Sequence, residues 1–200
     1  YDVNGRLQTI VDPRGGGLSA SREYDSLGRD SASVDNLGAV TRSRYDLSDE
    51  IIAVTDPRGL ITTYRRDGFG NVLETVSPDA GRSRDAYDAA GNRVRHVYQQ
   101  QAGVDIAIGY EYDALNRTTK VDYPNDPDVI YGYDEGPPAR HGVGRLTSMQ
   151  DASGITTMDY DARGNLRRRL LTSAKGSFEL NYEVDTGGHV TQLRYPGALV

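Results

Sequence analysis

The chain has 200 residues, of which 36% are hydrophobic, and its net charge of −6 comes from 29 acidic and 23 basic residues. This acidic balance disfavours a general affinity for nucleic acid or for an anionic membrane surface. The absence of cysteine excludes disulfides, thiolate nucleophiles and cysteine-ligated zinc, and no apolar run approaches the ~18 residues of a membrane-spanning helix.

Aspartate supplies 22 of the 29 acidic residues, and glutamate only 7. Because aspartate favours turns whereas glutamate favours helices, this imbalance predicts a chain rich in turns and poor in helix. The 14 tyrosines argue against disorder, since solvated low-complexity chains lack aromatic residues. We therefore expect an ordered chain whose polar composition reflects its architecture.

The dipeptide Tyr-Asp recurs along the whole chain, in steps of about 21 residues. Two copies are degenerate: Arg66-Asp67 replaces the pair, with Tyr64 two residues earlier, and Tyr182-Glu183 keeps only the tyrosine. The intact pairs begin at Tyr1, Tyr24, Tyr45, Tyr87, Tyr112, Tyr133 and Tyr160. We interpret residues 1–200 as a single array of about nine repeats.

The aspartate of each copy opens a four-residue segment, Asp-x-x-Gly, that is typical of a tight hairpin turn. Its carboxylate can accept the backbone N–H two residues later, and glycine tolerates the positive φ at which the chain reverses. Asp46–Asp49 lacks the glycine, and an insertion that carries Pro137, Pro138 and His141 separates Asp134 from Gly144. The residues expected to build the motif are Tyr1, Asp2, Gly5, Tyr24, Asp25, Gly28, Tyr45, Asp46, Asp67, Gly70, Tyr87, Asp88, Gly91, Tyr112, Asp113, Asn116, Tyr133, Asp134, Tyr160, Asp161, Gly164 and Tyr182.

A second corner follows the first by about ten residues, at 12–15, 35–38, 56–59 and, less regularly, 77–81. Asp at the first, Pro at the second and Gly at the fourth position are preferences of a type I turn. Subtracting about four residues per turn leaves strands of roughly six or seven residues. No interval is long enough for a helix of ordinary length.

The segments between corners have the composition and the alternation of strands: residues 7–11, 39–45, 60–64, 71–76 and 155–160. Tyrosines two residues apart, such as Tyr110 and Tyr112, fall on one face of a strand, so a ladder of tyrosines across neighbouring hairpins is expected. The pattern predicts an all-β fold, a long antiparallel meander whose Tyr-Asp corners each close a hairpin. A parallel β-helix is the rival topology, and two reversing corners in each repeat argue against it.

The other candidate sites have simpler interpretations. His96, His141 and His189 lack any metal-ligand spacing, and Gly142-Val143-Gly144 is not followed by the helix pattern of a phosphate loop. Pairs such as Asp126 with Asp128 and Asp46 with Asp49 could serve as calcium ligands or glycosidase carboxylates, and turn chemistry explains them more simply. Alternation splits the run 167–169 between two faces, so it forms no single basic patch. We expect no catalytic, cofactor-binding or metal-binding residue and no enzymatic activity.

The repeated pattern Tyr-x-Tyr-Asp-x-x-Gly-Asn/Arg, clearest at 24–29, 87–93 and 160–166, resembles the YD-repeat proteins. These form the rearrangement hotspot (Rhs) family of bacteria, with relatives in insecticidal toxin complexes and animal teneurins. The resemblance covers essentially the whole chain. It implies a meander that spirals into a hollow shell, which in toxin-bearing members surrounds a C-terminal effector.

This resemblance implies a structural container: a shell segment that encloses a C-terminal toxin for secretion and delivery in competition between bacterial cells. Its partners would then be the rest of the same shell, the toxin and a secretion apparatus, with no cofactor, no nucleic acid and no membrane insertion by this segment. The implied location is secreted or on the cell surface. The alternative is an extracellular adhesive or glycan-binding surface, motivated by rows of tyrosine and arginine.

The two ends fall inside the repeat pattern, since the chain starts at Tyr1-Asp2 and stops after a Tyr195-Pro196 pair that echoes Tyr123-Pro124. Repeats that stack on neighbours need capping repeats, and neither end resembles one. We therefore expect a window of a longer chain with both ends cut within a repeat.

Overall fold

The computed structural model describes residues 1–11, 19–100 and 103–195, which form β-strands and one short 3-10 helix, η1 (Pro138–Arg140). The all-β prediction, with helix limited to isolated turns, is confirmed. The 17 strands are β1 (Thr9–Val11), β2 (Ser19–Tyr24), β3 (Asp30–Val34), β4 (Val40–Tyr45), β5 (Ile51–Thr55), β6 (Ile61–Arg66), β7 (Val72–Ser77), β8 (Gly81–Tyr87), β9 (Arg93–Gln99), β10 (Asp105–Tyr112), β11 (Thr118–Asp122), β12 (Val129–Tyr133), β13 (Leu146–Asp151), β14 (Gly154–Tyr160), β15 (Leu166–Ser173), β16 (Gly176–Val184) and β17 (Val190–Arg194).

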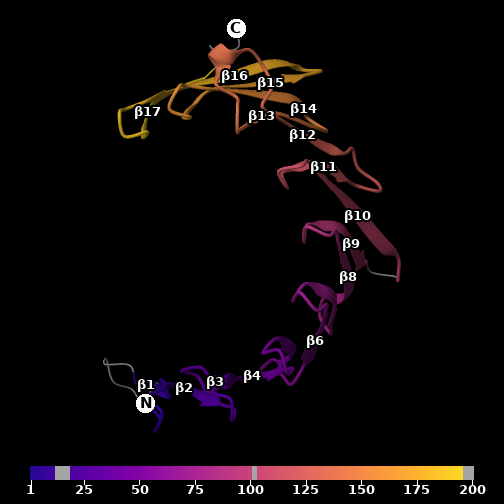
Figure 1. The fold of residues 1–200 in the computed structure, drawn as a ribbon, viewed down its shortest axis with the longest axis vertical. Helices are drawn as coiled ribbons and strands as arrows, with labels where there is room; N and C mark the ends of the chain where they lie inside the picture. The colour runs from indigo at the N-terminus through magenta and orange to yellow at the C-terminus, as the bar shows by residue number, and fades with distance from the viewer. Residues whose placement is uncertain (12–18, 101–102, 196–200) are drawn as a thin grey trace. The chain divides into compact units, whose positions relative to one another are not determined.

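The chain divides into two compact units, residues 1–87 with 96–106 and residues 88–95 with 107–200. In the first unit each strand from β1 to β8 pairs antiparallel with the next. In the second unit β10 to β17 do the same. The sequential antiparallel pairing is therefore confirmed within each unit, and a parallel β-helix is excluded there (Figure 1).

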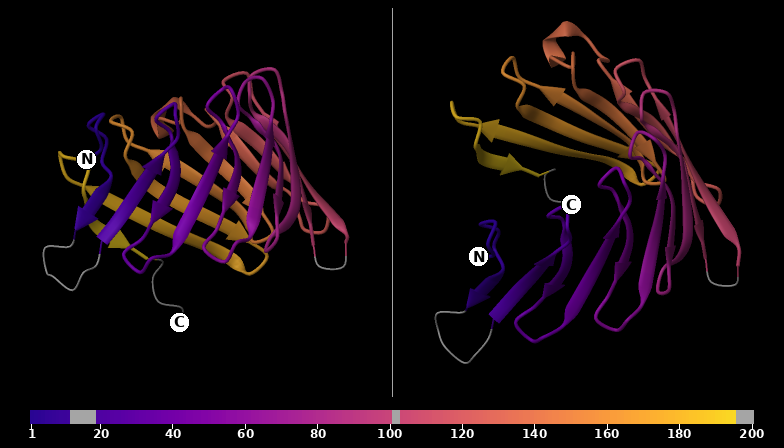
Figure 2. Two further views of the ribbon diagram at one scale, coloured as in Figure 1. Left: turned by 90° about the horizontal axis from the view of Figure 1, so that it is seen from below. Right: turned by 60° about the horizontal axis from the view of Figure 1, so that its bottom comes forward.

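The two kinds of corner lie at opposite ends of the strands. Because the meander reverses at every corner, the Tyr-Asp turns of a unit form one row and the second corners form the other (Figure 2). The second corners at 35–38, 56–59 and 77–81 join β3 to β4, β5 to β6 and β7 to β8, as predicted. The corner predicted at 12–15 lies outside the described residues, as does the end of the chain after Tyr195.

The same irregularity recurs in Tyr-Asp hairpins of both units. The register shifts by one residue directly before the motif position, for example between Glu23 and Tyr24 and between Asp159 and Tyr160. Such a bulge accompanies a type I turn whose following residue adopts a left-handed conformation. The sequence motif therefore encodes a turn and a bulge together.

Few side chains are fully buried. Among the described residues the buried ones are Ala32, Ala53, Val121, Thr147 and Thr156. Ala32 is flanked in the sheet by Glu23 and Arg42, whose side chains form an ion pair of 3.5 Å. A single-layer sheet has no second layer against which to bury large apolar groups, which explains the polar composition.

Candidate functional site

The turn aspartate is the centre of the repeated motif, and Asp88 shows how it is used. Its Oδ1 accepts the backbone N–H groups of Ala90 and Asn92, each at 2.9 Å. Its own N–H donates to the Asn92 carbonyl at 2.9 Å. The same two side-chain bonds, to residues two and four positions later, recur at Asp2, Asp25, Asp35, Asp46, Asp56, Asp67, Asp113, Asp161 and Asp185.

The fourth position of the turn has positive φ, as the glycine requirement predicts. Gly91 lies at φ 84°, where an L-residue with a side chain is strained. Asn116 and Asp49 take the same position at φ 60° and 64°. The turn that lacks glycine therefore keeps the geometry of the others, because Asn and Asp tolerate the left-handed region.

The second carboxylate oxygen of the turn aspartate binds the side chain four residues later. At Asp113 that side chain is Arg117, whose Nε donates at 2.7 Å, and at Asp88 it is Asn92, whose Nδ2 donates at 3.0 Å. These bonds lower the pKa of the turn carboxyls, and in each case the residue four positions later supplies the largest contribution. The affected groups are Asp2, Asp25, Asp67, Asp88, Asp113, Asp161 and Asp185.

The motif tyrosine connects its hairpin to the preceding one. The hydroxyl of Tyr45 donates to the carbonyl of Asp30 at 2.8 Å, across the pairing of β3 with β4. Equivalent bonds run from Tyr24, Tyr87, Tyr112, Tyr133 and Tyr160 to Leu7, Val72, Arg93, Thr118 and Leu146. Because the acceptor carbonyls belong to the repeat before, the tyrosine fixes the spacing between neighbouring turns.

Arginines that follow the turn glycine complete the connection. Arg29 binds Asp25 of its own turn through Nε at 2.7 Å, and its guanidinium lies 4.7 Å from the centre of the Tyr45 ring in the next repeat. The same stacking joins Arg6 to Tyr24, Arg117 to Tyr133 and Arg145 to Tyr160. The expected ladder of tyrosines is thus corrected: each tyrosine ring in these contacts lies against a guanidinium group of the preceding repeat.

The sequence motif has Asn or Arg after the turn glycine, but the sequence interpretation assigned no contact to that position. The signal was present, because the residue after the fourth turn position is arginine at Arg6, Arg29, Arg117 and Arg145. Their role depends on the next repeat, which lies about 20 residues away in the chain and only one hairpin away in the sheet. A single motif copy does not reveal that contact.

The structure shows which residues take the motif positions in the two degenerate copies. Arg66 occupies the tyrosine position, where its Nε donates to the carbonyl of Ile51 at 3.4 Å. In the last copy the turn is made by Asp185, which follows Val184, and the register shift falls between Glu183 and Val184. Tyr182 therefore lies two residues before the motif position, and the assignment of Tyr182-Glu183 as the motif copy was wrong.

The insertion after Asp134 leaves the hairpin closed. Asp134 donates its N–H to the carbonyl of Arg145, and its Oδ1 accepts the N–H of Gly144 at 2.5 Å. Arg145 takes the position of the arginine that follows the turn, with its guanidinium 5.6 Å from the Tyr160 ring. Gly142-Val143-Gly144 forms the end of this turn, as expected.

Several of the alternative catalytic and metal-binding candidates are bound to other side chains. Asp49 accepts a bond from Arg29 at 2.7 Å, and Asp128 pairs with Lys120 at 2.8 Å. His96 Nδ1 lies 2.8 Å from Asp85 Oδ1, and His189 is the partner of its own turn aspartate.

The described residues contain no group of three or more His, Cys, Asp or Glu side chains placed to hold a metal ion. Nor does any helix within them have the length and apolar character needed to cross a membrane.

The basic run 167–169 is divided between the two faces of β15, as alternation predicts. Arg168 pairs with Asp159 at 3.2 Å and with Glu179 at 2.8 Å. Arg169 lies opposite Met158 in the sheet register, on the other face. The run therefore contributes to an ion-pair network within the sheet.

Comparison with known proteins identifies the repeat. The family model described as RHS Repeat matches residues 45–82 and 141–177. The double-stranded DNA deaminase toxin A of Burkholderia cenocepacia (strain H111) is 29% identical over 183 residues, or 88% of this chain and 11% of the relative. The tRNA(Glu)-specific nuclease WapA of Bacillus subtilis subsp. natto (strain BEST195) is 29% identical over 91 residues, or 44% of this chain and 4% of the relative.

Solved structures share the fold. The TcdB2-TccC3-Cdc42 crystal structure matches with a TM-score of 0.72 at 17% identity, over 89% of this chain and 11% of the other. The Photorhabdus luminescens Tc holotoxin pore matches with a TM-score of 0.71 at 14% identity, over 89% of this chain and 10% of the other. The chain thus spans only about a tenth, or less, of the length of the proteins that it matches.

Proposed function

We propose that the sheet of this chain forms a section of the wall of a hollow protein shell. The RHS Repeat matches in two segments and the fold shared with the Tc holotoxin pore support this proposal. The observation that carries the proposal is that the motif residues bind their own turn and the neighbouring hairpin. Aspartate closes its own turn, while tyrosine and arginine bind the neighbouring hairpin. Such a motif extends a wall by one hairpin per repeat.

The cargo of this shell is a toxin segment of the same polypeptide. The two curated relatives are named for a nuclease and for a DNA deaminase toxin, and this chain covers only 4% and 11% of their lengths. We therefore place the catalytic activity outside these 200 residues and assign to them a structural role. The remaining repeats of the shell are the direct partners of this segment, and the whole protein acts outside the cell that makes it.

The physical properties of the sheet suit a wall that is wetted on both sides. No large apolar side chain is fully buried among the residues that the structure describes. Charged side chains pair across neighbouring strands, as Glu74 does with Arg82 at 2.5 Å. A polar inner surface binds an enclosed polypeptide weakly, because it offers no continuous apolar area. The cargo can then leave without the wall being unfolded.

The test is protease protection of the natural polypeptide that contains this array. Where the array is intact, we expect the enclosed segment to resist digestion after exposed segments have been cleaved. Gly28→Val forces a β-branched residue to φ 84° and destabilises one hairpin turn of the wall. This variant should expose the segment, whereas Leu27→Val in the same turn, at an exposed side chain, should not.

If the segment were digested in the unmodified protein as rapidly as in Gly28→Val, that result would contradict the enclosure. If the protein instead bound glycans or cell surfaces with no protected segment, the adhesive alternative would replace it.

A further inference from the structure

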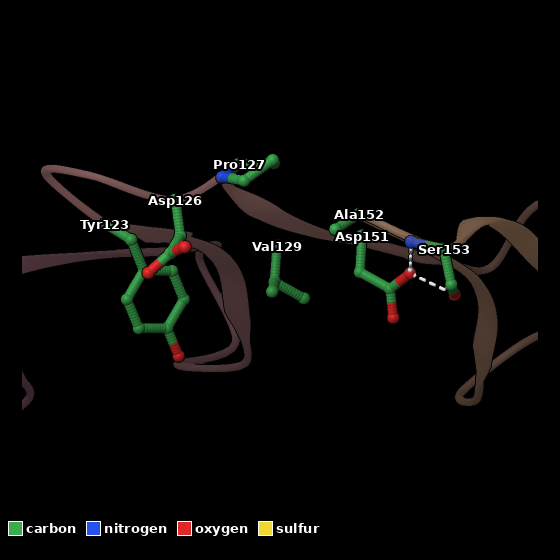
Figure 3. A pocket seen from close by; sticks show the side chains of 7 residues that line it. All are labelled: Tyr123, Asp126, Pro127, Val129, Asp151, Ala152 and Ser153. Atoms are coloured by element: carbon green, nitrogen blue, oxygen red, sulfur yellow. Dashed lines mark hydrogen bonds between the residues drawn. The ribbon is translucent and has the colours of Figure 1, made fainter.

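A cavity of about 390 Å³ lies in the second unit, at the end of the strands opposite the Tyr-Asp turns. The loop between β11 and β12 forms one side and the turn between β13 and β14 forms the other. Figure 3 shows Tyr123, Asp126, Val129 and Asp151 projecting to the same side. The lining is Tyr123, Asp126, Pro127, Val129, Asp151, Ala152 and Ser153.

Asp126 and Asp151 give the cavity two carboxylates that form no ion pair with the described residues. The exposed Asp126 makes no hydrogen bond or ion pair with any residue in the described part of the chain. Asp151 Oδ1 accepts the N–H and the hydroxyl of Ser153, at 2.8 and 2.5 Å, and these bonds lower the pKa of the Asp151 carboxyl. The positive charge of Arg169 acts on Asp151 without pairing with it, and contributes to lowering the pKa of that carboxyl. Lys120, a nearby cation, is occupied by Asp128 at 2.8 Å.

The same chemical groups bind arginine elsewhere in this chain. The guanidinium of Arg117 lies 4.3 Å from the centre of the Tyr133 ring and donates to Asp113 and Asp134, each at 2.7 Å. One aromatic face and two carboxylates thus hold one arginine. The cavity offers a tyrosine ring and two carboxylates, with no arginine among its lining residues.

We propose that this cavity is a docking site for an arginine side chain of a partner polypeptide. The apolar side chains of Pro127, Val129 and Ala152 accommodate the aliphatic stem. Tyr123 stacks on the planar guanidinium, which the carboxylates of Asp126 and Asp151 neutralise. Arginine fits better than lysine, because only the guanidinium combines a stacking plane with several donors.

Titration of the ¹⁵N-labelled 200-residue chain with the peptide acetyl-Gly-Arg-Gly-amide tests the site. We expect saturable shifts of the amide resonances of Tyr123, Val129 and Ser153, which weaken as salt is added. The same peptide with citrulline in place of arginine keeps the shape and removes the charge. The citrulline peptide should bind about tenfold more weakly than the arginine peptide, or worse. The lysine peptide should also bind more weakly than the arginine peptide, by a smaller factor.

Asp126→Asn combined with Asp151→Asn removes both charges, while the amide oxygen introduced at position 151 can still accept the bonds from Ser153. We expect the arginine peptide to bind this variant about tenfold more weakly. Asp35→Asn, at a second corner in the other unit, should leave binding of the arginine peptide unchanged. Amide resonances of the double variant that are unchanged away from the cavity control for its folding.

Equal binding of the citrulline and arginine peptides would overturn the proposal, as would binding that survives the double substitution. Shifts produced by methyl glucoside, in the absence of shifts from the arginine peptide, would identify a sugar site instead. These outcomes are independent of whether the array encloses a cargo.

Discussion

A single motif tyrosine serves two neighbouring hairpins, with its ring against an arginine and its hydroxyl on a backbone carbonyl. Tyr45 bonds to Asp30 while Arg29 lies over its ring. Phenylalanine would keep the stacking surface and lose the hydrogen bond. The hydroxyl therefore explains why the motif contains tyrosine when little apolar area is buried.

Tyr45→Phe should lower the free energy of unfolding by about 1 kcal/mol, the usual net value of one hydrogen bond. The matched control is Tyr64→Phe, because the Tyr64 hydroxyl makes no hydrogen bond with the described residues. Urea unfolding of both variants measures the difference. Equal losses would show that the carbonyl bond contributes nothing beyond the ring.

The neighbouring copies that begin at Tyr45 and Arg66 replace the two residues that usually join one repeat to the next. Glu50 stands where Arg6 and Arg29 stand in the earlier turns, and Arg66 stands in place of the next tyrosine. Their side chains form an ion pair of 3.4 Å, in the position of the usual arginine-tyrosine stack. The contact between repeats is preserved with different chemistry.

This exchange predicts coupling between the two positions. Glu50→Arg alone should destabilise the chain, because it places two guanidinium groups together. Adding Arg66→Tyr should recover the loss by restoring the usual stack. The coupling energy from a double-mutant cycle should be roughly 0.5–1 kcal/mol for a pair so exposed to solvent. A coupling energy near zero would mean that the contact between positions 50 and 66 does not stabilise the packing of the two repeats.

At the scale of an element, the hairpin of β12 and β13 contains an insertion without losing its turn. The inserted residues fold back on the sheet, where Glu135 accepts a bond from Ser148 at 2.8 Å and Arg140 lies 3.5 Å from Asp159. Gly142 has no space for a Cβ, which would lie 2.6 Å from a methyl group of Thr147. The insertion thus covers part of the sheet while Asp134 and Arg145 keep their places in the motif.

Deletion of residues 135–141 should leave a chain that folds with nearly unchanged stability. It joins Asp134 to Gly142-Val143-Gly144-Arg145, which has the spacing of the other turns. Shortening the loop gains about 1 kcal/mol of closure entropy, which offsets the lost contacts of Glu135 and Arg140. Circular dichroism and urea unfolding check this result, and loss of the cooperative transition would show that the insertion holds the hairpin together.

The sequence predicted most of the elements because turn-forming residues recur at fixed positions in the repeats. Asp, Gly and Pro at fixed spacing located the corners, and alternation located the strands between them. The last copy was misplaced by two residues because Tyr182 has the commoner motif letter, while the turn depends on Asp185 and Gly188. Turn chemistry outweighs the aromatic residue in setting register.

The contacts between repeats were not predictable in the same way. The sequence implied that tyrosines share a face, and their neighbours in space depend on hairpin register and on the bulge before each motif. The cavity at Tyr123 and Asp126 joins a loop and a turn that are separated by more than one strand in sequence. Neither segment contains a recognisable binding motif.

At the scale of the whole molecule, the turns of both units depend on ionised carboxylates. The pKa values of Asp2, Asp25 and Asp67 are lowered in the first unit, as are those of Asp113 and Asp161 in the second. Because the unfolded chain lacks these turn bonds, its aspartates bind protons at higher pH than the folded ones do. Acid therefore acts on many hairpins at once.

The free energy of unfolding should be nearly constant around neutral pH and should fall below about pH 4, near the ordinary pKa of aspartate. The sign follows from the lowered folded pKa values: stability from these carboxyls is complete above the unfolded pKa and is lost as the pH falls through the folded values. Replacing Asp25, Asp67 and Asp88 together by asparagine keeps an acceptor oxygen in each turn and removes three titrating groups. The variant should lose less stability between pH 5 and pH 3 than the unmodified chain, in urea unfolding at matched salt. An identical pH dependence would show that acid unfolds the sheet by general charge repulsion instead of through its turns.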